Sequence, residues 1–345
     1  MRVQSRKREA FPTVTLNSHL TTLDALSAYE GLARLARRTR HEPAAVEVLP
    51  GDVGRRRYLR LTLPGGETVL GVVYTPEEAD SRRRWVAART TLGQRLRVPR
   101  LLADDEEGNQ IVEDLGRTDL AARLSQRPSE RPAWLARAAS AAAVLAGMTD
   151  PKINPPFEAA FFRRELDLAR EAVFDLYLAA PLSPDDREAH DSWADALSRE
   201  IAAHPRALCH RDYHGNNLFP LDEGVGWIDF QDMRSGPDSY DLASLLWERT
   251  TLDWMAKDLA DPVIDGYARV RGLDAVAFRS RFNRTLLQRA WKVCGTFARA
   301  VAQGRGETYR RYLPGEIALV GRLLSGTAED RRFKRVFQTR LASLC

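Results

Sequence analysis

The sequence is short of cysteine and of long apolar runs, and each shortage excludes a class of protein. Its three cysteines, Cys209, Cys294 and Cys345, are too few and too scattered for a disulfide framework or a Cys-x-x-Cys metal site, so we expect three reduced thiols. No apolar run approaches the roughly 20 residues that a membrane-spanning helix needs. The basic stretch 1–14 lacks the apolar segment of a secretory signal. We therefore expect a soluble, cytoplasmic protein with no membrane partner.

Lysine is also scarce, because arginine carries nearly all of the positive charge. Lysine and arginine together number 52 against 47 acidic residues, which gives a formal net charge of +5. Acidic residues interleave with the arginines almost everywhere, and the dense basic cluster 55–57 is too small for a phosphate-binding face, so we expect no nucleic-acid partner. No lysine stands between Lys7 and Lys152.

The first third of the chain has the pattern of a small mixed lobe. Leucine and alanine recur at helical spacing in its first predicted helix, and apolar or alternating segments separated by Pro-Gly turns then indicate an antiparallel three-stranded meander. The predicted elements are a helix over 23–39, strands over 46–49, 57–63 and 68–74, a helix over 76–96, and strands over 98–102 and 110–113.

Beyond residue 116 the pattern changes to long helical segments. We expect helices over 132–148, 159–179, 184–202, 262–270 and 275–302, which bracket one short β-like island over 208–229. The change of character and the length of 345 residues predict an α+β protein of two lobes. The expected domains are a β-rich N-lobe over 1–115 and a larger helical C-lobe over 116–345.

The β-like island contains the residues best suited to chemistry. His210, Asp212 and Asn217 match the pattern H-x-D-x-x-x-x-N, which is typical of the catalytic loop of kinases, and Asp229 follows twelve residues later among apolar neighbours. The alternative is a polar hairpin without chemistry. Carboxylates flanked by apolar residues are rarely buried without a function, which disfavours that alternative.

Phosphoryl transfer explains why these residue types occur together. The charge that develops on the phosphates must be neutralised by Mg²⁺, which prefers oxygen ligands such as an Asn amide and an Asp carboxylate. Asn217 and Asp229 can supply these ligands from the two ends of a hairpin. Asp212 can then accept the proton of the acceptor hydroxyl. We expect His210 to pack and to hydrogen-bond the loop.

The segments HRDYHGNNL, IDFQD and GPDSYDLASLL resemble the aminoglycoside phosphotransferase and choline kinase-like superfamily, whose fold is that of protein kinases. More narrowly, the chain resembles the bacterial anomeric N-acetylmuramate and N-acetylglucosamine kinases. Further similarity lies in residues 51–61, 111–116 and 287–299. The resemblance implies a bilobal protein-kinase-like fold and an ATP- and Mg²⁺-dependent kinase of peptidoglycan recycling, with Asp212 as catalytic base and Asn217 and Asp229 as ligands of Mg²⁺.

The resemblance also implies a place for the nucleotide. The turn from Gly51 to Gly54 would cover the phosphates, and the main chain around Glu113, Asp114 and Leu115 would bind adenine. Related kinases hold the phosphates with a lysine on the third strand, but this sequence has no lysine in its predicted strands, so we expect Arg55, Arg56 and Arg57 to supply that charge. A catalytically dead nucleotide-binding scaffold is the alternative, which an intact Asp212, Asn217 and Asp229 disfavours.

The resemblance also indicates the acceptor. We expect the small-molecule acceptor to be N-acetylmuramate or N-acetylglucosamine, phosphorylated at its anomeric hydroxyl. An aminoglycoside or a choline-type acceptor is the alternative. The expected substrate-binding residues are donors or neutral groups beside the two catalytic segments, with one carboxylate: Arg211, Tyr213, His214, Gln231 and Asp232. Arg211 can pair with a lactyl carboxylate or, equally, tie the loop to the helical lobe. We expect Asp241 to cap the helix that follows it.

Overall fold

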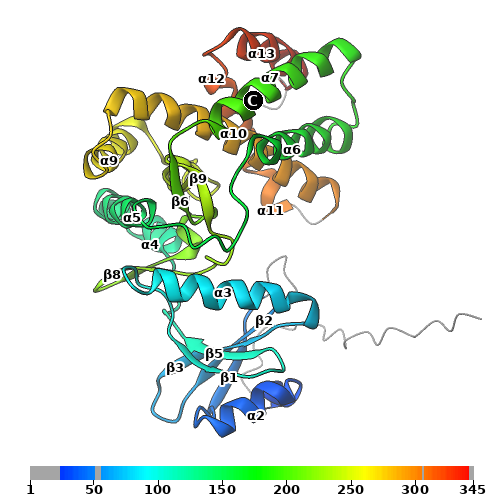
Figure 1. Cartoon of the computed structure of the whole chain (residues 1–345). Helices are drawn as coiled ribbons and strands as arrows, with labels where there is room; N and C mark the ends of the chain where they lie inside the picture. Colours follow the sequence, from blue (N-terminus) through cyan, green and yellow to red (C-terminus); the bar gives the residue numbers. More distant parts are fainter. Residues whose placement is uncertain (1–23, 51–55, 305–306, 342–345) are drawn as a thin grey trace, which may run out of the picture. The chain divides into compact units, whose positions relative to one another are not determined.

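The computed structural model describes residues 24–50, 56–304 and 307–341 and divides the chain into two compact units (Figure 1). The first unit comprises the described residues up to Asp80 together with 100–114, and the second comprises 81–99 and the residues from Leu115 onward. The chain thus passes between the units after residues 80, 99 and 114. Residues 81–99, which lie inside the expected N-lobe 1–115, group with the larger unit.

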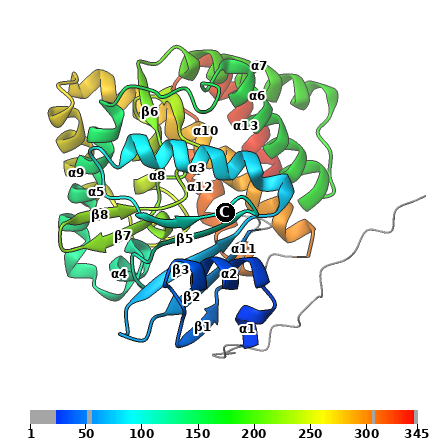
Figure 2. The same cartoon turned by 60° about the horizontal axis from the view of Figure 1, so that its bottom comes forward.

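The first unit is built on a five-stranded antiparallel sheet in the order β1-β2-β3-β5-β4 (Figure 2). The predicted meander is therefore correct but is part of a larger sheet, because β5 pairs with the free edge of β3. The strands are β1 (Ala45–Val48), β2 (Arg57–Thr62), β3 (Thr68–Val73), β4 (Leu101–Asp104) and β5 (Asn109–Glu113).

Two short helices, α1 (Asp24–Ser27) and α2 (Glu30–Arg38), stand where the sequence predicts one helix over 23–39. Leu26 and Leu32 both belong to the apolar core against the sheet, together with Leu59 and Leu61 of β2. On one straight helix, side chains six residues apart point about 120° away from each other. The break between α1 and α2 lets both leucines face the same core.

The second unit is mainly helical. Its helices are α3 (Ala79–Leu92, of which residues from 81 belong here), α4 (Leu120–Gln126), α5 (Arg131–Ala146), α6 (Ala159–Arg170), α7 (Pro184–Ala202), α8 (Tyr240–Leu246), α9 (Lys257–Val270), α10 (Ala275–Ala302), α11 (Glu307–Arg310), α12 (Leu313–Leu323) and α13 (Ala328–Leu341). Three short non-α helical turns accompany them within the described residues of this unit: Pro128–Glu130, Glu171–Tyr177 and Gly215–Asn217.

Helix α10 forms the centre of this unit, packing against α6, α7, α8, α9 and α12. Its Trp291 is fully buried and contacts aromatic rings from three other helical segments, Phe174, Trp193 and Phe333. Gly295 lies so close to α6 that a β-carbon there would overlap Ala169. Helix α10 is therefore held firmly in the core of this unit.

Two small antiparallel ribbons replace a sheet in the larger unit. The ribbons pair β6 (Arg206–Cys209) with β9 (Arg234–Pro237), and β7 (Leu218–Leu221) with β8 (Gly224–Trp227). Helix α3 packs on this region, where Trp85 stacks on Phe230 with ring centroids 5.6 Å apart. The loops that join the ribbons contain all four residues of the predicted catalytic motif.

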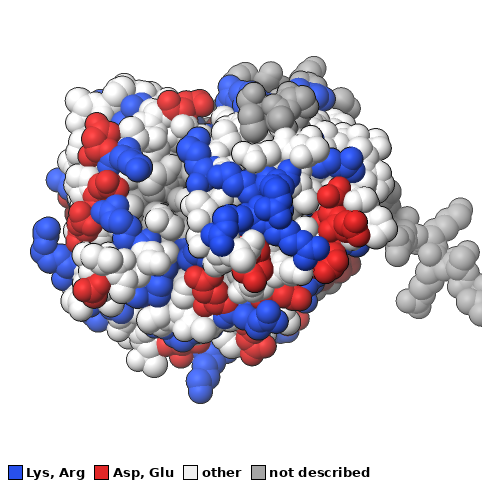
Figure 3. Space-filling model, turned by 90° about the horizontal axis from the view of Figure 1, so that it is seen from above, with Lys and Arg blue, Asp and Glu red and all other residues white. Residues whose placement is uncertain are grey.

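No helix in the described part of the chain has the length and apolar character needed to cross a membrane. On the face of the larger unit seen in Figure 3, lysine and arginine side chains gather near the middle, and acidic side chains lie around and between them. This mixture agrees with the interleaving of charges along the sequence.

Candidate active site

The predicted catalytic loop connects the two ribbons. It runs from His210, directly after β6, to Asn217, directly before β7. The ring of His210 is buried, and its Nε2 lies 2.9 Å from the carbonyl oxygen of Ile228, just after β8. His210 thus packs and hydrogen-bonds the loop, as predicted from the sequence.

The buried carboxylate of Asp241 anchors the beginning of this loop. Its two oxygens accept hydrogen bonds from the backbone N–H groups of His210, at 2.6 Å, and Arg211, at 3.0 Å. Burial raises the pKa of Asp241, against the opposing influence of His210 and of these two donors. The expected capping role is wrong, because Asp241 is already inside α8 and its oxygens point to the loop rather than to the start of its own helix.

Arg211 is held in a backbone conformation that few residues adopt. Its φ of 84° lies in the left-handed region, which costs a non-glycine residue about 1–3 kcal/mol. The buried Arg289 of α10 donates from Nη1 to the Arg211 carbonyl at 3.2 Å and from Nη2 to the Ser244 hydroxyl at 2.7 Å. Arg289 and Asp241 therefore hold the loop from both sides and fix where the next residue, Asp212, points.

Asp212 is half-buried and has several positively charged neighbours. Burial alone would raise the pKa of Asp212, but Lys292 of α10 opposes it most strongly, followed by Arg211. The result is a pKa lowered to about 2. Lys292 itself lies 3.7 Å from Glu165 of α6, and its own pKa is raised, because Glu165 and other acidic neighbours outweigh the effect of burial. Asp212 is thus an ionised carboxylate at neutral pH, able to accept a hydrogen bond or a proton.

Asn217 and Asp229 lie at the same end of the β7–β8 ribbon. Leu218 pairs with Trp227 in the ribbon, and the N–H of Ile228 donates to the Asn217 carbonyl at 2.9 Å. Asp229 lies two residues beyond β8 and not inside a strand as expected from the sequence, because its φ of 60° breaks the extended conformation. Asp229 thus directly follows Ile228, the residue whose N–H is bonded to Asn217 at the start of β7.

The side chains of Asn217 and Asp229 offer oxygen atoms of the kind that a magnesium ion binds. The amide nitrogen of Asn217 donates to the Asp212 carbonyl at 2.9 Å, so the amide oxygen is turned to the opposite side. One oxygen of Asp229 accepts a hydrogen bond from Gln231 Nε2 at 2.9 Å. An amide oxygen and an oriented carboxylate are oxygen ligands of the kind that Mg²⁺ binds.

The other predicted substrate-binding residues have different surroundings. Asp232 is half-buried and accepts from Arg211 Nη1 at 3.1 Å. Gln231 is buried and contacts Asp229, so it orients a predicted ligand of Mg²⁺. Tyr213 is completely buried, and its hydroxyl donates to the Ala138 carbonyl at 2.8 Å. We therefore assign Tyr213 a structural role in place of the expected contact with an acceptor.

His214 has acidic neighbours, Glu248 and Asp212, and basic neighbours, Arg249 and Arg289. Burial lowers the pKa of His214, against the opposing influence of Glu248 and Asp212. The ring Nε2 lies 3.5 Å from the amide nitrogen of Asn217, at the limit of a hydrogen bond. His214 is thus a neighbour of both catalytic candidates in the loop.

The residues expected to bind the nucleotide lie in part outside the described residues. Gly51, Gly54 and Arg55 fall there. Arg56 is paired with Glu78, with Nε 3.8 Å from Oε1, and lies over the Tyr74 ring. Arg57 is exposed at the start of β2.

The segment from Glu113 to Leu115 ends the sheet and leaves the first unit. The N–H of Glu113 donates to the Arg100 carbonyl at 2.9 Å, and the carboxylate of Asp114 accepts from Arg60 Nε at 2.6 Å and from the Thr68 hydroxyl at 2.8 Å. The side chain of Asp114 thus has its hydrogen-bond partners in the first unit, and Leu115 is the first residue of the second unit after this segment. Arg60, a buried cation in an apolar strand, was not identified from the sequence.

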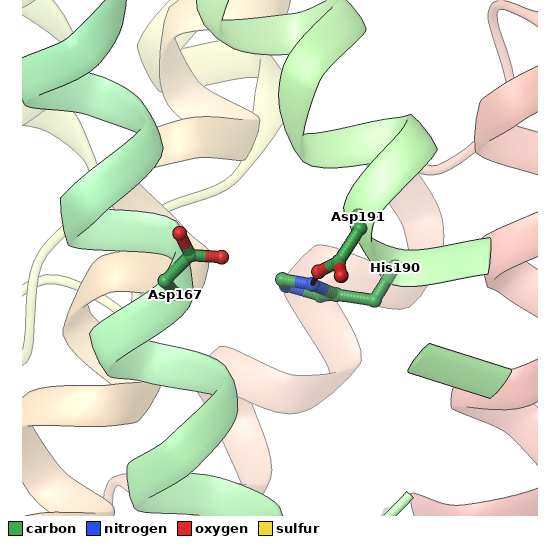
Figure 4. A group of neighbouring side chains, drawn as sticks. All are labelled: Asp167, His190 and Asp191. Carbon is green, nitrogen blue, oxygen red and sulfur yellow. Dashed lines mark hydrogen bonds and ion pairs between the residues drawn. The ribbon is translucent and has the colours of Figure 1, made fainter. Parts of the chain in front are cut away.

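A group of two carboxylates and a histidine lies elsewhere in the larger unit (Figure 4). Asp167 of α6 faces His190 and Asp191 of α7, with ligand atoms within 4.8 Å of one another. The guanidinium of Arg163 already occupies this group: its Nε lies 3.0 Å from Asp167, and its Nη2 lies 3.2 Å from Asp191. Burial lowers the pKa of His190, which packs on Phe333. We interpret the group as an ion-pair cluster that joins α6 to α7.

Sequence reasoning missed three residues that support the site. Arg289 and Lys292 lie in the segment 287–299, which contributed to the resemblance without an assigned role. Asn154 is buried, and its amide nitrogen donates to the carbonyls of Gln231 and Met233, both at 2.9 Å. Asn154 thereby fixes the chain just after Asp229. Its one sequence signal was a polar residue among prolines, which is too weak to identify such a role.

The geometry defines a phosphotransferase, and comparisons with known proteins agree. Residues 45–279 match the model of the phosphotransferase enzyme family, so the chain belongs to that family. It is an enzyme that transfers a phosphoryl group to a hydroxyl group of a small molecule.

Individual relatives and solved structures resemble the chain over most of its length or of theirs. The chain is 29% identical over 272 residues to the N-acetylmuramate/N-acetylglucosamine kinase of Neisseria meningitidis, covering 76% of this chain and 80% of that protein. It is 30% identical over 205 residues to the kinase of the same name from Pseudomonas aeruginosa, covering 59% and 60%. The ADP-bound aminoglycoside phosphotransferase APH(2″)-Ib has a TM-score of 0.59 at 16% identity and covers 88% of this chain and 98% of its own. The protein-kinase-like fold expected from the sequence is therefore confirmed.

Proposed function

We propose that the protein is an ATP- and Mg²⁺-dependent kinase that transfers the γ-phosphate to the anomeric hydroxyl of N-acetylglucosamine or N-acetylmuramate. The observation that carries the proposal is the arrangement of Asp212, Asn217 and Asp229 at one end of the β7–β8 ribbon, with Asp212 ionised. The names of the curated relatives support the choice of acceptor. Because the reaction consumes ATP, we place it in the cytoplasm.

Asp212 acts as the acceptor-side base in this proposal. The carboxylate receives a hydrogen bond from the acceptor hydroxyl, turns its oxygen toward the γ-phosphate, and takes the proton late in the transfer. An anomeric hydroxyl is more acidic than other sugar hydroxyls, so a carboxylate with a low pKa is a sufficient base. Asp241 and Arg289 hold the loop in position during the step.

Asn217 and Asp229 would hold Mg²⁺, which neutralises charge on the phosphates when bound. Gln231 orients the carboxylate of Asp229, and Asp212 orients the amide of Asn217 through its carbonyl. The nucleotide would lie against the first unit, with adenine at the main chain of 113–115 and the phosphates near Arg56 and Arg57.

The charge around Asp212 favours a neutral or anionic acceptor over a cationic one. Lys292, Arg211 and Arg289 all lie close enough to lower the pKa of Asp212. An aminoglycoside or a choline-type acceptor would bring its own positive charge to this region and would be repelled. The sugar acceptors carry no positive charge.

A screen of acceptors tests the proposal. ADP release is measured with N-acetylglucosamine, N-acetylmuramate, kanamycin and choline, each with Mg·ATP, and the product is identified by phosphorus NMR. We expect an amino sugar to be the best acceptor and its product to be the 1-phosphate. Asp212→Asn should lower kcat at least 100-fold and leave the affinity for Mg·ATP within about threefold.

Three outcomes would contradict the proposal. Kanamycin or choline turning over faster than both sugars would exclude an amino-sugar kinase. A 6-phosphate product would exclude the anomeric hydroxyl. A kcat of Asp212→Asn near that of the wild type would exclude this loop as the catalytic one.

A further inference from the structure

Three arginine side chains gather around one phenylalanine ring beside the catalytic loop. The guanidinium carbons of Arg164, Arg211 and Arg234 lie 5.4, 6.0 and 5.5 Å from the centroid of the Phe161 ring. Phe161 and Arg164 belong to α6, Arg211 directly precedes Asp212, and Arg234 begins β9. Because a ring has two faces, at least two of these cations share a face, and like charges repel at such distances.

The acidic residues around this group only partly balance its charge. Asp232 is the carboxylate that pairs with it, at 3.1 Å from Arg211 and 3.9 Å from Arg234. The neighbouring Glu165 is already paired with Lys292. Arg164 is exposed and has no carboxylate within ion-pair distance among the described residues. Asp212 also lies near Arg211, but among the described residues Asp232 is the carboxylate that forms ion pairs with these guanidinium groups.

Two of the three guanidinium groups are held in place before any ligand arrives. Arg211 donates from Nη1 to the Asp232 carboxylate at 3.1 Å, and Arg234 donates from Nε to the Asp232 carbonyl at 3.0 Å. The Nε of Arg211 is buried and has no hydrogen-bond partner within the described residues. Burial and the nearby Arg211 lower the pKa of Arg234, as expected for crowded cations. A rigid cluster of donors with excess positive charge is a preorganised site for an anion.

We propose that Arg164, Arg211 and Arg234 around Phe161 form a subsite that binds a carboxylate group of the acceptor sugar. The inference rests on the proposed function, because it assigns the carboxylate-bearing sugar, N-acetylmuramate, to this subsite beside Asp212. A guanidinium matches the planar geometry of a carboxylate and forms two parallel hydrogen bonds with it. The ring of Phe161 supports the planar guanidinium groups by stacking. N-acetylglucosamine has no group for this subsite.

The test compares acceptors that differ mainly in charge. The enzyme is assayed with N-acetylmuramate and with its methyl ester, which adds one methyl group and removes the negative charge, and N-acetylglucosamine is the reference. Arg164→Gln is the main variant, because the exposed position makes misfolding improbable as a cause of any effect. The control is Arg137→Gln, since Arg137 is also exposed and lies over an aromatic ring, that of Trp134, at 4.8 Å.

We expect Arg164→Gln to lower the ratio of kcat/KM for N-acetylmuramate over its methyl ester about tenfold, a loss of about 1.4 kcal/mol. Arg137→Gln should leave that ratio within twofold of the wild type. Arg164→Lys should recover part of the ratio, because it restores the charge but not the planar fork. Raising the salt concentration should lower the ratio for the wild type more than for Arg164→Gln.

Failure of the subsite and failure of the proposed function give different results. A wild type that phosphorylates the sugars, with a ratio that Arg164→Gln does not change, overturns the subsite and leaves the kinase assignment intact. The same holds if the wild type uses the acid and the ester equally well. A wild type that phosphorylates neither sugar overturns the proposed function and the subsite together.

Discussion

Asp241 offers a direct test of how the catalytic loop is positioned. Its carboxylate accepts two backbone N–H groups, at 2.6 and 3.0 Å, in a buried setting. In Asp241→Asn, the amide oxygen can accept only one of them, and the amide nitrogen faces the other donor. A hydrogen bond to a charged group contributes about 1.5–3 kcal/mol, and a buried unsatisfied donor costs about 1–3 kcal/mol. We therefore predict a loss of about 2–4 kcal/mol in the free energy of unfolding.

The effect on activity should exceed the effect of lower stability. The two N–H groups belong to His210 and Arg211, so their release lets the backbone before Asp212 move. A displacement of about 1 Å at a catalytic group can lower the rate about 100-fold. We expect kcat of Asp241→Asn to fall about 30- to 100-fold. The KM for ATP should change little, because Asn217 and Asp229 are held by the β7–β8 ribbon.

Asp238 provides a matched control. It is as deeply buried as Asp241, precedes the same helix and pairs with Arg281 at 2.7 Å, but it makes no contact with the loop. Asp238→Asn should lose comparable stability and keep kcat within about threefold of the wild type. Stability is measured by urea unfolding, and kcat by ADP release under conditions in which both variants are folded. Equal kcat values for the two variants would refute the anchoring role of Asp241.

The remaining predictions concern buried charges. Lys292→Met removes the cation that lowers the pKa of Asp212 most. The acid limb of the pH profile of kcat/KM should therefore move to higher pH. An unchanged acid limb would show that Lys292 has only a packing role. Burial, helped by repulsion from Glu248, raises the pKa of Glu316 to about 8. Because this exceeds the unfolded value of about 4.5, the stabilisation is complete below pH 4.5 and is lost as the pH rises through 8. Between pH 5 and 9 the wild type should lose about 4 kcal/mol more than Glu316→Gln, as measured by urea unfolding, and parallel curves would contradict the assignment.

Two helices with a capping residue in the sequence were predicted with their observed boundaries, although the capped helix α4 was not predicted. The helices over 184–202 and 275–302 are found with the predicted bounds. Each begins after a residue whose side chain accepts a hydrogen bond from the first turn: Ser183 from Asp186 N–H, at 3.2 Å, and Asp274 from Ala277 N–H, at 2.8 Å. Such local signals do not depend on the rest of the fold.

Other helices were missed or misjudged because tertiary contacts override local pattern. The expected helix over 159–179 becomes a π-helix from Glu171 to Tyr177. Helix α12 contains Pro314 and Gly315, which indicate a turn when read alone. In α13, five basic residues weaken the apolar pattern of the sequence. The apolar face of this helix is nevertheless buried in the structure and consists of Phe333, Val336, Phe337 and Leu341.

The catalytic motif could be read from the sequence because its residues lie close together in the chain. The supports of the loop could not, since Asp241 and Arg289 are 30 and 78 residues from Arg211, which they contact. Spacing carries no information about contacts over such separations. The role expected for Tyr213 failed for a related reason: a tyrosine beside a catalytic residue fits either a substrate or a core, and only packing distinguishes them.

The charges around Asp212 connect the fold to the chemistry. Arg289 and Lys292 project from α10, which the aromatic contacts of Trp291 fix in the core of the larger unit. Burying such cations is costly unless anions lie nearby, and Asp212 and Glu165 supply them. Asp212 is therefore kept ionised by groups that themselves need its charge. The same mutual dependence explains why this half-buried carboxylate keeps a pKa of about 2, ready to accept a hydrogen bond from a neutral acceptor.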